Sequence, residues 1–206
     1  MSRSSEETQV IEGPGGDLEL AITRVEAPVA IAVVCHPHPL QGGTLNNKVV
    51  HTLMRAARDK GASVVRFNFR GVGRSSGNHD HGVGEVDDCL AVLRWAQANL
   101  GSLPVWLMGF SFGGYVAAAA ARRLSEWPER LQLVAPSVER LPFAGLLPLG
   151  RTVVYMGEAD EVVAPEAVFD LLEGQPDVEV VRFAETGHFF HGRLVELKEA
   201  VASRLA

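Results

Sequence analysis

The chain has 206 residues, of which 47% are hydrophobic and 21% charged, a composition that predicts one folded domain and excludes disorder over most of its length. Its 25 acidic residues exceed its 19 basic residues, and the formal charge of −6 gives no electrostatic reason to bind nucleic acid or an anionic membrane. The first residues lack the apolar core of a signal peptide and no apolar run approaches ~20 residues, so we expect a cytoplasmic protein with no membrane partner.

The N-terminal part of the chain predicts a β-hairpin. Its two strands are expected at residues 8–12 and 18–25, around the turn Gly-Pro-Gly-Gly at residues 13–16. Glycine permits the positive φ angles that a hairpin turn demands. The residues before the hairpin, 1 to about 8, are expected to form a flexible tail.

Beyond the hairpin, short runs rich in β-branched residues alternate with helical patterns. Strands are predicted at residues 29–35, 63–69, 105–109, 131–135, 152–156 and 178–183, and helices at 47–60, 85–100, 112–124, 165–173 and 193–205. Most of these strands are apolar on both faces, which is typical of a parallel sheet covered by helices on each side. The sequence therefore predicts a single α/β domain over residues 1–206, with a mostly parallel sheet and an antiparallel start.

The motif G-x-S-x-G at residues 109–113 carries the strongest chemical signal. An apolar strand precedes it and an alanine-rich helix follows it, which is the setting of a nucleophile elbow. Such a turn is tight enough to exclude a Cβ at Gly109 and Gly113. We predict that Ser111 is a nucleophile and that the Phe112 amide, at the helix start, binds an oxyanion. The alternative is a glycine-rich connection with a capping serine.

A serine hydroxyl reacts only when a base takes its proton and a third group orients that base. Asp160 follows the predicted strand at residues 152–156, and His188 follows the one at 178–183. Because the carboxyl ends of parallel strands meet at one edge of a sheet, we predict a catalytic set of Ser111, Asp160 and His188. Their nearest rivals are Glu139, Glu158 and Glu161 for the acid and His191 for the base.

The loop after the strand at residues 29–35 reads H-P-H-P-L-Q-G-G. Proline has no amide hydrogen, so the second oxyanion donor must be the amide of His38 or of Leu40, with His38 slightly favoured. His36 is expected to be packed and hydrogen-bonded beneath this loop. The pairs His36-x-His38 and His79-x-His81 raise the alternative of a metal site, but zinc needs three or four ligands in tetrahedral geometry. We expect no metal and no cofactor.

Two further features, the cysteines and a glycine-rich segment, are not expected to take part in the chemistry. Cys35 and Cys89 belong to no C-x-x-C pair and are expected to be reduced and buried. The segment R-G-V-G-R-S-S-G at residues 70–77 lacks the third glycine of a dinucleotide loop, so a mobile or substrate-facing loop is the better interpretation.

Taken together, these motifs resemble those of the α/β-hydrolase superfamily over nearly the whole chain from about residue 9. The matching segments are G-F-S-F-G-G, R-F-N-F-R-G-V-G-R-S-S-G, G-x-x-D-x-V-V-x-P, T-G-H-F-F and H-P-H-P-x-x-G-G. The last resembles a bacterial subgroup of short hydrolases, distantly similar to dienelactone hydrolases. Those use a cysteine nucleophile where this chain has Ser111, which favours ester or thioester hydrolysis over lactone chemistry.

The resemblance implies a serine hydrolase that acts on small-molecule carboxylic esters or thioesters through a Ser-His-Asp triad. Larger members carry a lid between two late strands, where this chain has only residues 136–151. We therefore expect an open site without a lid. An acyltransferase using the same residues and a non-catalytic scaffold are the alternatives, and the sequence leaves the oligomeric state open.

Overall fold

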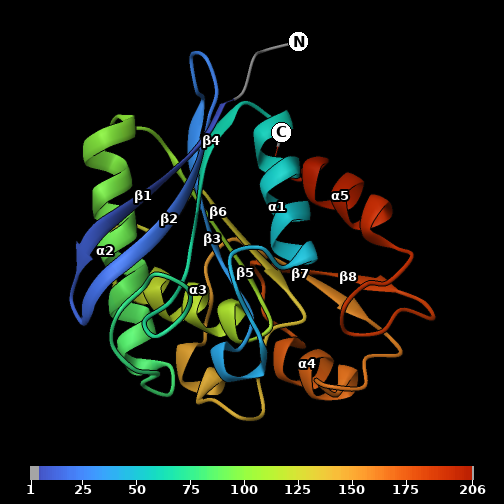
Figure 1. Cartoon of the computed structure of the whole chain (residues 1–206). Coiled ribbons are helices and arrows are strands. Elements are labelled where there is room, and N and C mark those ends of the chain that lie inside the picture. The colour runs from blue at the N-terminus through green and yellow to red at the C-terminus, as the bar shows by residue number, and fades with distance from the viewer. Residues whose placement is uncertain (1–4, 206) are drawn as a thin grey trace.

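The structure, a computed structural model, describes residues 5–205 and contains one eight-stranded sheet in the order β1-β2-β4-β3-β5-β6-β7-β8 (Figure 1). The strands are β1 (Ser5–Gly13), β2 (Gly16–Arg24), β3 (Ala30–Cys35), β4 (Ala62–Phe67), β5 (Val105–Phe110), β6 (Arg130–Val134), β7 (Thr152–Gly157) and β8 (Val178–Phe183). The helices are α1 (Lys48–Asp59), α2 (Val83–Leu100), α3 (Phe112–Arg123), α4 (Pro165–Leu172) and α5 (Leu194–Ala202), with 3-10 turns η1 (Pro39–Gln41) and η2 (Phe143–Leu146).

The sheet has the predicted mixture of directions. β1 and β2 form an antiparallel hairpin in which Gly13 pairs with Gly16, and β2 runs antiparallel to β4. Every other neighbouring pair is parallel. The predicted fold class, an α/β domain with a mostly parallel sheet and an antiparallel start, is confirmed.

The predicted flexible tail is too long. Residues 5–8 already pair with β2, and only residues 1–4 of the expected tail lie outside the described residues. Two acidic side chains help to hold this start of β1, because Glu7 forms an ion pair with Arg24 at 2.8 Å and Glu6 with Arg66 at 2.5 Å. Residues 5–8 have no alternation of apolar and polar side chains, so hydrophobic periodicity could not predict this part of the strand.

Helices cover both faces of the sheet. α1 packs with α5 on one side, and α2 packs with α3 on the other (Figure 1). β3, β4 and β5 are buried along their whole length, as expected for central parallel strands, whereas β8 lies at an edge and is only partly buried. The Asn47 side chain accepts hydrogen bonds from the amides of Val49 and Val50 and so caps α1.

The order of the strands creates a crevice at one edge of the sheet. From β3 the chain continues to β4 on one side, and it later returns to β5 on the other side of β3. The loops after β3 and β5 therefore diverge, and ligands bind at such switch points in open α/β sheets. Residues 136–151 contain only η2, as expected for a chain without room for a lid.

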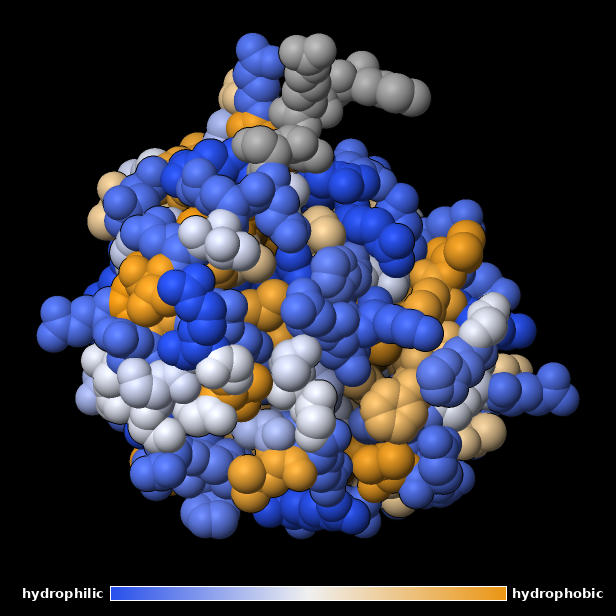
Figure 2. Space-filling view, viewed as in Figure 1, coloured by the Kyte–Doolittle hydropathy of each residue, from blue (hydrophilic) through white to orange (hydrophobic). Residues whose placement is uncertain are grey.

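The surface seen in Figure 2 is mostly hydrophilic, and its apolar residues form small, separate groups. Among residues 5–205, the large hydrophobic side chains left exposed are Val29, Leu40, Val83, Phe189 and Val195. No helix in this described part is long and apolar enough to span a membrane.

Candidate active site

Ser111 occupies the sharp turn between β5 and α3. Its backbone has φ 55° and ψ −117°, a conformation that a residue with a Cβ adopts only under strain. The backbone holds it there, because the Ser111 amide donates to the Val134 carbonyl at 2.9 Å and the Ser137 amide donates to the Ser111 carbonyl at 3.1 Å. The side chain makes no capping hydrogen bond to α3. The capping-serine alternative is therefore wrong.

Two glycines make this turn possible. A Cβ on Gly109 would overlap the backbone of Gly113, and a Cβ on Gly113 would overlap the carbonyl oxygens of Cys35 and His36. The close approach of α3 to β3 thus requires glycine at the two positions that define the motif.

One connected set of hydrogen bonds joins the three predicted catalytic side chains. His188 Nδ1 lies 2.7 Å from Asp160 Oδ2, and His188 Nε2 lies 3.0 Å from Ser111 Oγ. The other carboxylate oxygen of Asp160 accepts the amides of Val162 and Val163, both at 2.8 Å. Because the carboxylate accepts the hydrogen bond that Nδ1–H donates, the neutral imidazole keeps its proton on Nδ1 and has a lone pair on Nε2 directed at the serine hydroxyl.

Two of the alternative candidates for the catalytic acid, Glu161 and Glu139, are hydrogen-bonded to backbone amides. Glu161 Oε2 accepts the backbone amide of His188 at 3.2 Å, and Glu139 Oε2 accepts that of Ala164 at 3.2 Å. Glu161 therefore positions the histidine loop, a role that no sequence motif signalled. The two remaining rivals have exposed side chains: Glu158 and His191.

His36 is completely buried beneath the loop after β3, as expected. Its Nδ1 donates to the Pro37 carbonyl at 2.6 Å, and its Nε2 accepts the Phe69 amide at 3.1 Å. Burial lowers the pKa of His36 to about 4, and the bond to Pro37 only partly offsets this effect. Both ring nitrogens of His36 are therefore used in hydrogen bonds to the backbone. Among residues 5–205, no group of three or more His, Cys, Asp or Glu side chains is arranged to hold a metal ion.

The buried His36 predicts a loss of stability in mild acid. Between pH ~6.5, where an unfolded histidine titrates, and pH ~4, His36 is protonated in the unfolded chain but stays neutral in the folded chain. The free energy of unfolding should therefore fall by about 3 kcal/mol from this group alone as the pH drops through that window, with no loss above it. Urea unfolding of wild type and His36→Asn at pH 7 and pH 4.5 measures this difference.

Between pH 7 and pH 4.5, the free energy of unfolding of His36→Asn should fall less than that of the wild type, by most of the contribution of His36. This expectation holds whatever the variant's stability at pH 7. The matched control is His191→Asn, which removes an exposed histidine and should keep the wild-type loss. Equal losses in wild type and His36→Asn would contradict the assignment.

The two candidate donors in the loop after β3 differ in their partners. The Leu40 amide donates to His38 Nδ1 at 3.2 Å, so it is already engaged. His38 and Phe112 both line the pocket beside Ser111, with their rings 5.0 Å apart between centroids, whereas the Leu40 side chain is exposed. Phe112 is the first residue of α3, where an amide has no acceptor within its own helix.

The loop after β4 is fastened to α2. Arg70 Nε and Nη2 donate to the buried carboxylate of Asp88 at 3.0 and 2.7 Å. Glu85, also fully buried, accepts the amides of Asp80 and Gly82, both at 2.8 Å, and its Oε1 lies 2.7 Å from Nδ1 of His79. These bonds hold the part of the loop that brings His79 and His81 to the pocket wall, whereas none of residues 70–77 is among the pocket-lining residues. That residues 70–77 face a substrate stays a prediction.

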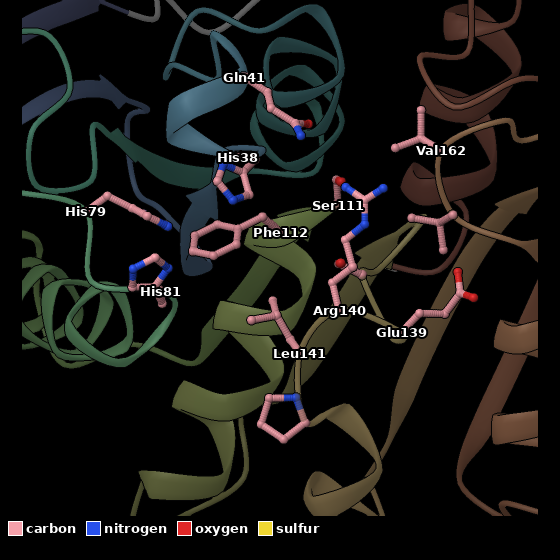
Figure 3. A pocket seen from close by; sticks show the side chains of 13 residues that line it. His38, Gln41, His79, His81, Ser111, Phe112, Glu139, Arg140, Leu141 and Val162 are labelled. Carbon is pink, nitrogen blue, oxygen red and sulfur yellow. The ribbon is translucent and has the colours of Figure 1, made fainter.

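A pocket of about 330 Å³ opens beside Ser111 (Figure 3). Its walls come from the loops after β3, β4, β5, β6 and β7, and its lining residues are His38, Gln41, His79, His81, Ser111, Phe112, Ser137, Glu139, Arg140, Leu141, Pro142, Val162 and Val163. Sequence reasoning missed Arg140, Leu141 and Pro142, because no motif marks a side chain that enters the pocket through the path of a loop.

The two cysteines lie away from this pocket. Cys35 on β3 and Cys89 on α2 are free and fully buried, with their sulfur atoms 3.6 Å apart. Burial raises the pKa of the Cys35 thiol, so it remains protonated and unreactive. Both cysteines pack in the core, as predicted.

Comparisons with known proteins bear on the fold and the family of the chain. A model of the alpha/beta hydrolase fold family matches residues 39–136. An uncharacterized protein of Rickettsia prowazekii is 36% identical over 202 residues, which cover 92% of this chain and 84% of that protein.

Solved structures extend the likeness to the whole fold. An alpha-beta serine hydrolase homologue from Coxiella burnetii is 45% identical, with a TM-score of 0.92 over 97% of each chain. An α/β serine hydrolase without lid from Xanthomonas campestris is 41% identical, with a TM-score of 0.90 over 97% of this chain and 93% of that one. With this fold, this elbow and these relatives, the chain belongs to the α/β-hydrolase family.

Proposed function

We propose that the protein is a serine hydrolase that cleaves small carboxylic esters or thioesters through an acyl-enzyme on Ser111. The observation that carries this proposal is the hydrogen-bonded series from Asp160 through His188 to Ser111, with bonds of 2.7 and 3.0 Å, which ends at the pocket. A nucleophile, a base and a group that orients the base are the parts that acyl transfer requires.

In the first step, Ser111 Oγ attacks the carbonyl carbon while His188 Nε2 takes the hydroxyl proton. Asp160 keeps the imidazole in the correct tautomer and stabilises the positive charge that it gains. The imidazolium then returns the proton to the departing alcohol or thiol, which leaves the acyl group on Ser111. Water, activated by the same histidine, releases the acid in a second round.

The negative charge that develops on the carbonyl oxygen needs donors already in place. We assign this role to the backbone amides of Phe112 and His38. Phe112 stands at the start of α3, where the positive end of the helix dipole adds to its effect. His38 is preferred over Leu40 because the Leu40 amide is bonded to the His38 ring.

The pocket supports substrates of modest size. Its volume of about 330 Å³ lies near the lower end of the range for small-molecule sites, and no lid segment closes it among residues 136–151. Leu141 and Pro142 supply apolar surface, whereas Phe143, the largest side chain of η2, is fully buried in the core.

Labelling with a fluorophosphonate tests the proposed nucleophile directly. The reagent's phosphorus reacts with an activated serine hydroxyl and expels fluoride, so the native protein should gain one phosphonyl group on Ser111. Mass spectrometry of the tryptic peptide covering residues 95–122 locates the group, because this peptide contains Ser102 as an internal comparison. Protein unfolded in urea should stay unlabelled, since the base is then no longer beside the serine. Modification of another residue, or none, would reject the proposal.

A further inference from the structure

Arg140 is a cation without an anionic partner at the edge of the pocket. It follows β6, lines the pocket with Ser111, and extends toward Ser111 in the view of Figure 3. Within the described residues 5–205, no ion pair joins its guanidinium to a carboxylate, although most other arginines of the chain have one. An arginine placed in this way has its full set of donors available to a ligand.

The neighbouring carboxylates do not neutralise it. Glu139 bonds to the Ala164 amide, and Figure 3 shows its side chain directed away from that of Arg140. Glu85 lies behind the opposite wall, fully buried, with its oxygens used by His79 and two backbone amides. The pocket therefore carries one guanidinium without a carboxylate partner, and the carboxylate among its lining residues, Glu139, is bonded to a backbone amide.

The wall across from Arg140 adds a neutral donor. Partial burial is the main cause that lowers the pKa of His38; the neighbouring His79 and Arg140 lower this pKa further, and the Glu85 carboxylate partly opposes them. His38 Nδ1 accepts the Leu40 amide, so the neutral ring carries its proton on Nε2. His38 and Arg140 both line the same small pocket.

We propose that the pocket selects esters or thioesters that carry a carboxylate elsewhere in the molecule, with the Arg140 guanidinium binding this carboxylate while Ser111 attacks the ester carbonyl. This inference rests on the proposed function. A guanidinium binds a carboxylate through two parallel hydrogen bonds, which orient the substrate as well as attract it. In a chain with a net charge of −6, such a local cation also offsets the general repulsion of anionic substrates.

Matched substrates test the inference. Monomethyl glutarate and its primary amide differ only in the remote charge and place it on the acyl side; acetyl glycolate and acetyl glycolamide place it on the alcohol side. The measured quantity is the ratio of kcat/KM for acid over amide, because intrinsic reactivity then cancels between enzyme variants. In Arg140→Gln this ratio should fall about tenfold for at least one pair, as expected for a lost charge-assisted hydrogen bond.

Two control variants separate the effect of the Arg140 charge from a general effect of losing an arginine. Arg140→Lys keeps the charge and should retain much of the preference, whereas Arg122→Gln, on the exposed end of α3, should leave both ratios unchanged. Ratios that stay within about twofold of wild type in Arg140→Gln for both pairs would overturn the inference, because a charge-assisted bond contributes more than that.

A binding measurement separates this inference from the proposed function. Calorimetric titration with glutarate should show at least fivefold weaker binding to Arg140→Gln than to wild type. If no ester is hydrolysed but this difference holds, the hydrolase proposal fails and the carboxylate site stands. Equal affinities, or no binding to either protein, would overturn the carboxylate site even in an active esterase.

Discussion

Replacement of Ser111 by alanine should lower kcat for a small activated ester by about 10⁴-fold or more, because Ser111 is the pocket residue whose hydroxyl lies beside the His188 base. The fold should survive. Alanine keeps the Cβ of serine, so the strained backbone at φ 55° costs the variant no more than it costs the wild type. Initial rates at saturating ester, together with thermal unfolding of both proteins, separate lost chemistry from lost structure.

The cysteines serve as controls for the nucleophile. Cys35→Ala and Cys89→Ala each remove a buried thiol that is not among the pocket-lining side chains and should keep most of the turnover. If Ser111→Ala retained near wild-type turnover while a folded cysteine variant lost it, the reaction would run through a thiol and the assignment of Ser111 would be wrong.

Asp160→Asn should be nearly as damaging, with kcat reduced by as much as ~10⁴-fold. The geometry explains why an almost isosteric change has this effect. One carboxylate oxygen is held by the amides of Val162 and Val163, so the asparagine oxygen will take that place and turn its NH₂ group toward His188. Nδ1 must then accept a hydrogen bond, which moves the ring proton to Nε2 and leaves no base for Ser111.

The matched control is Glu158→Gln, which neutralises an exposed carboxylate in the same loop and should change kcat little. Measurements of kcat and of the NMR signals of the His188 ring protons would follow both the rate and the tautomer. A large loss in Glu158→Gln, or an Asp160→Asn enzyme with near wild-type turnover, would show that another group orients the histidine.

Local patterns were sufficient for the order and type of the elements, because the signals act over a few residues. Buried parallel strands such as β3 and β5 are continuous apolar runs in the sequence. The start of β1 was missed for the opposite reason. Residues 5–8 are polar, and their strand is held by pairing with β2 and by ion pairs to Arg24 and Arg66 that lie far away in the sequence.

By itself the sequence determined the sharp turn after β5, since Gly109 must leave room for the backbone of Gly113 only four residues on, and it determined that Asp160 and His188 follow predicted strands. The need for glycine at position 113 comes from the tertiary contact with the carbonyl oxygens of Cys35 and His36. Only the tertiary structure decided which polar groups are already hydrogen-bonded within the protein and which line the pocket. The Leu40 amide is engaged by the His38 ring, Glu161 holds the His188 backbone, and Arg140 reaches the pocket. Such pairings depend on the three-dimensional paths of loops, where a shift of an ångström makes or breaks a hydrogen bond, and no local pattern in the sequence encodes that distance.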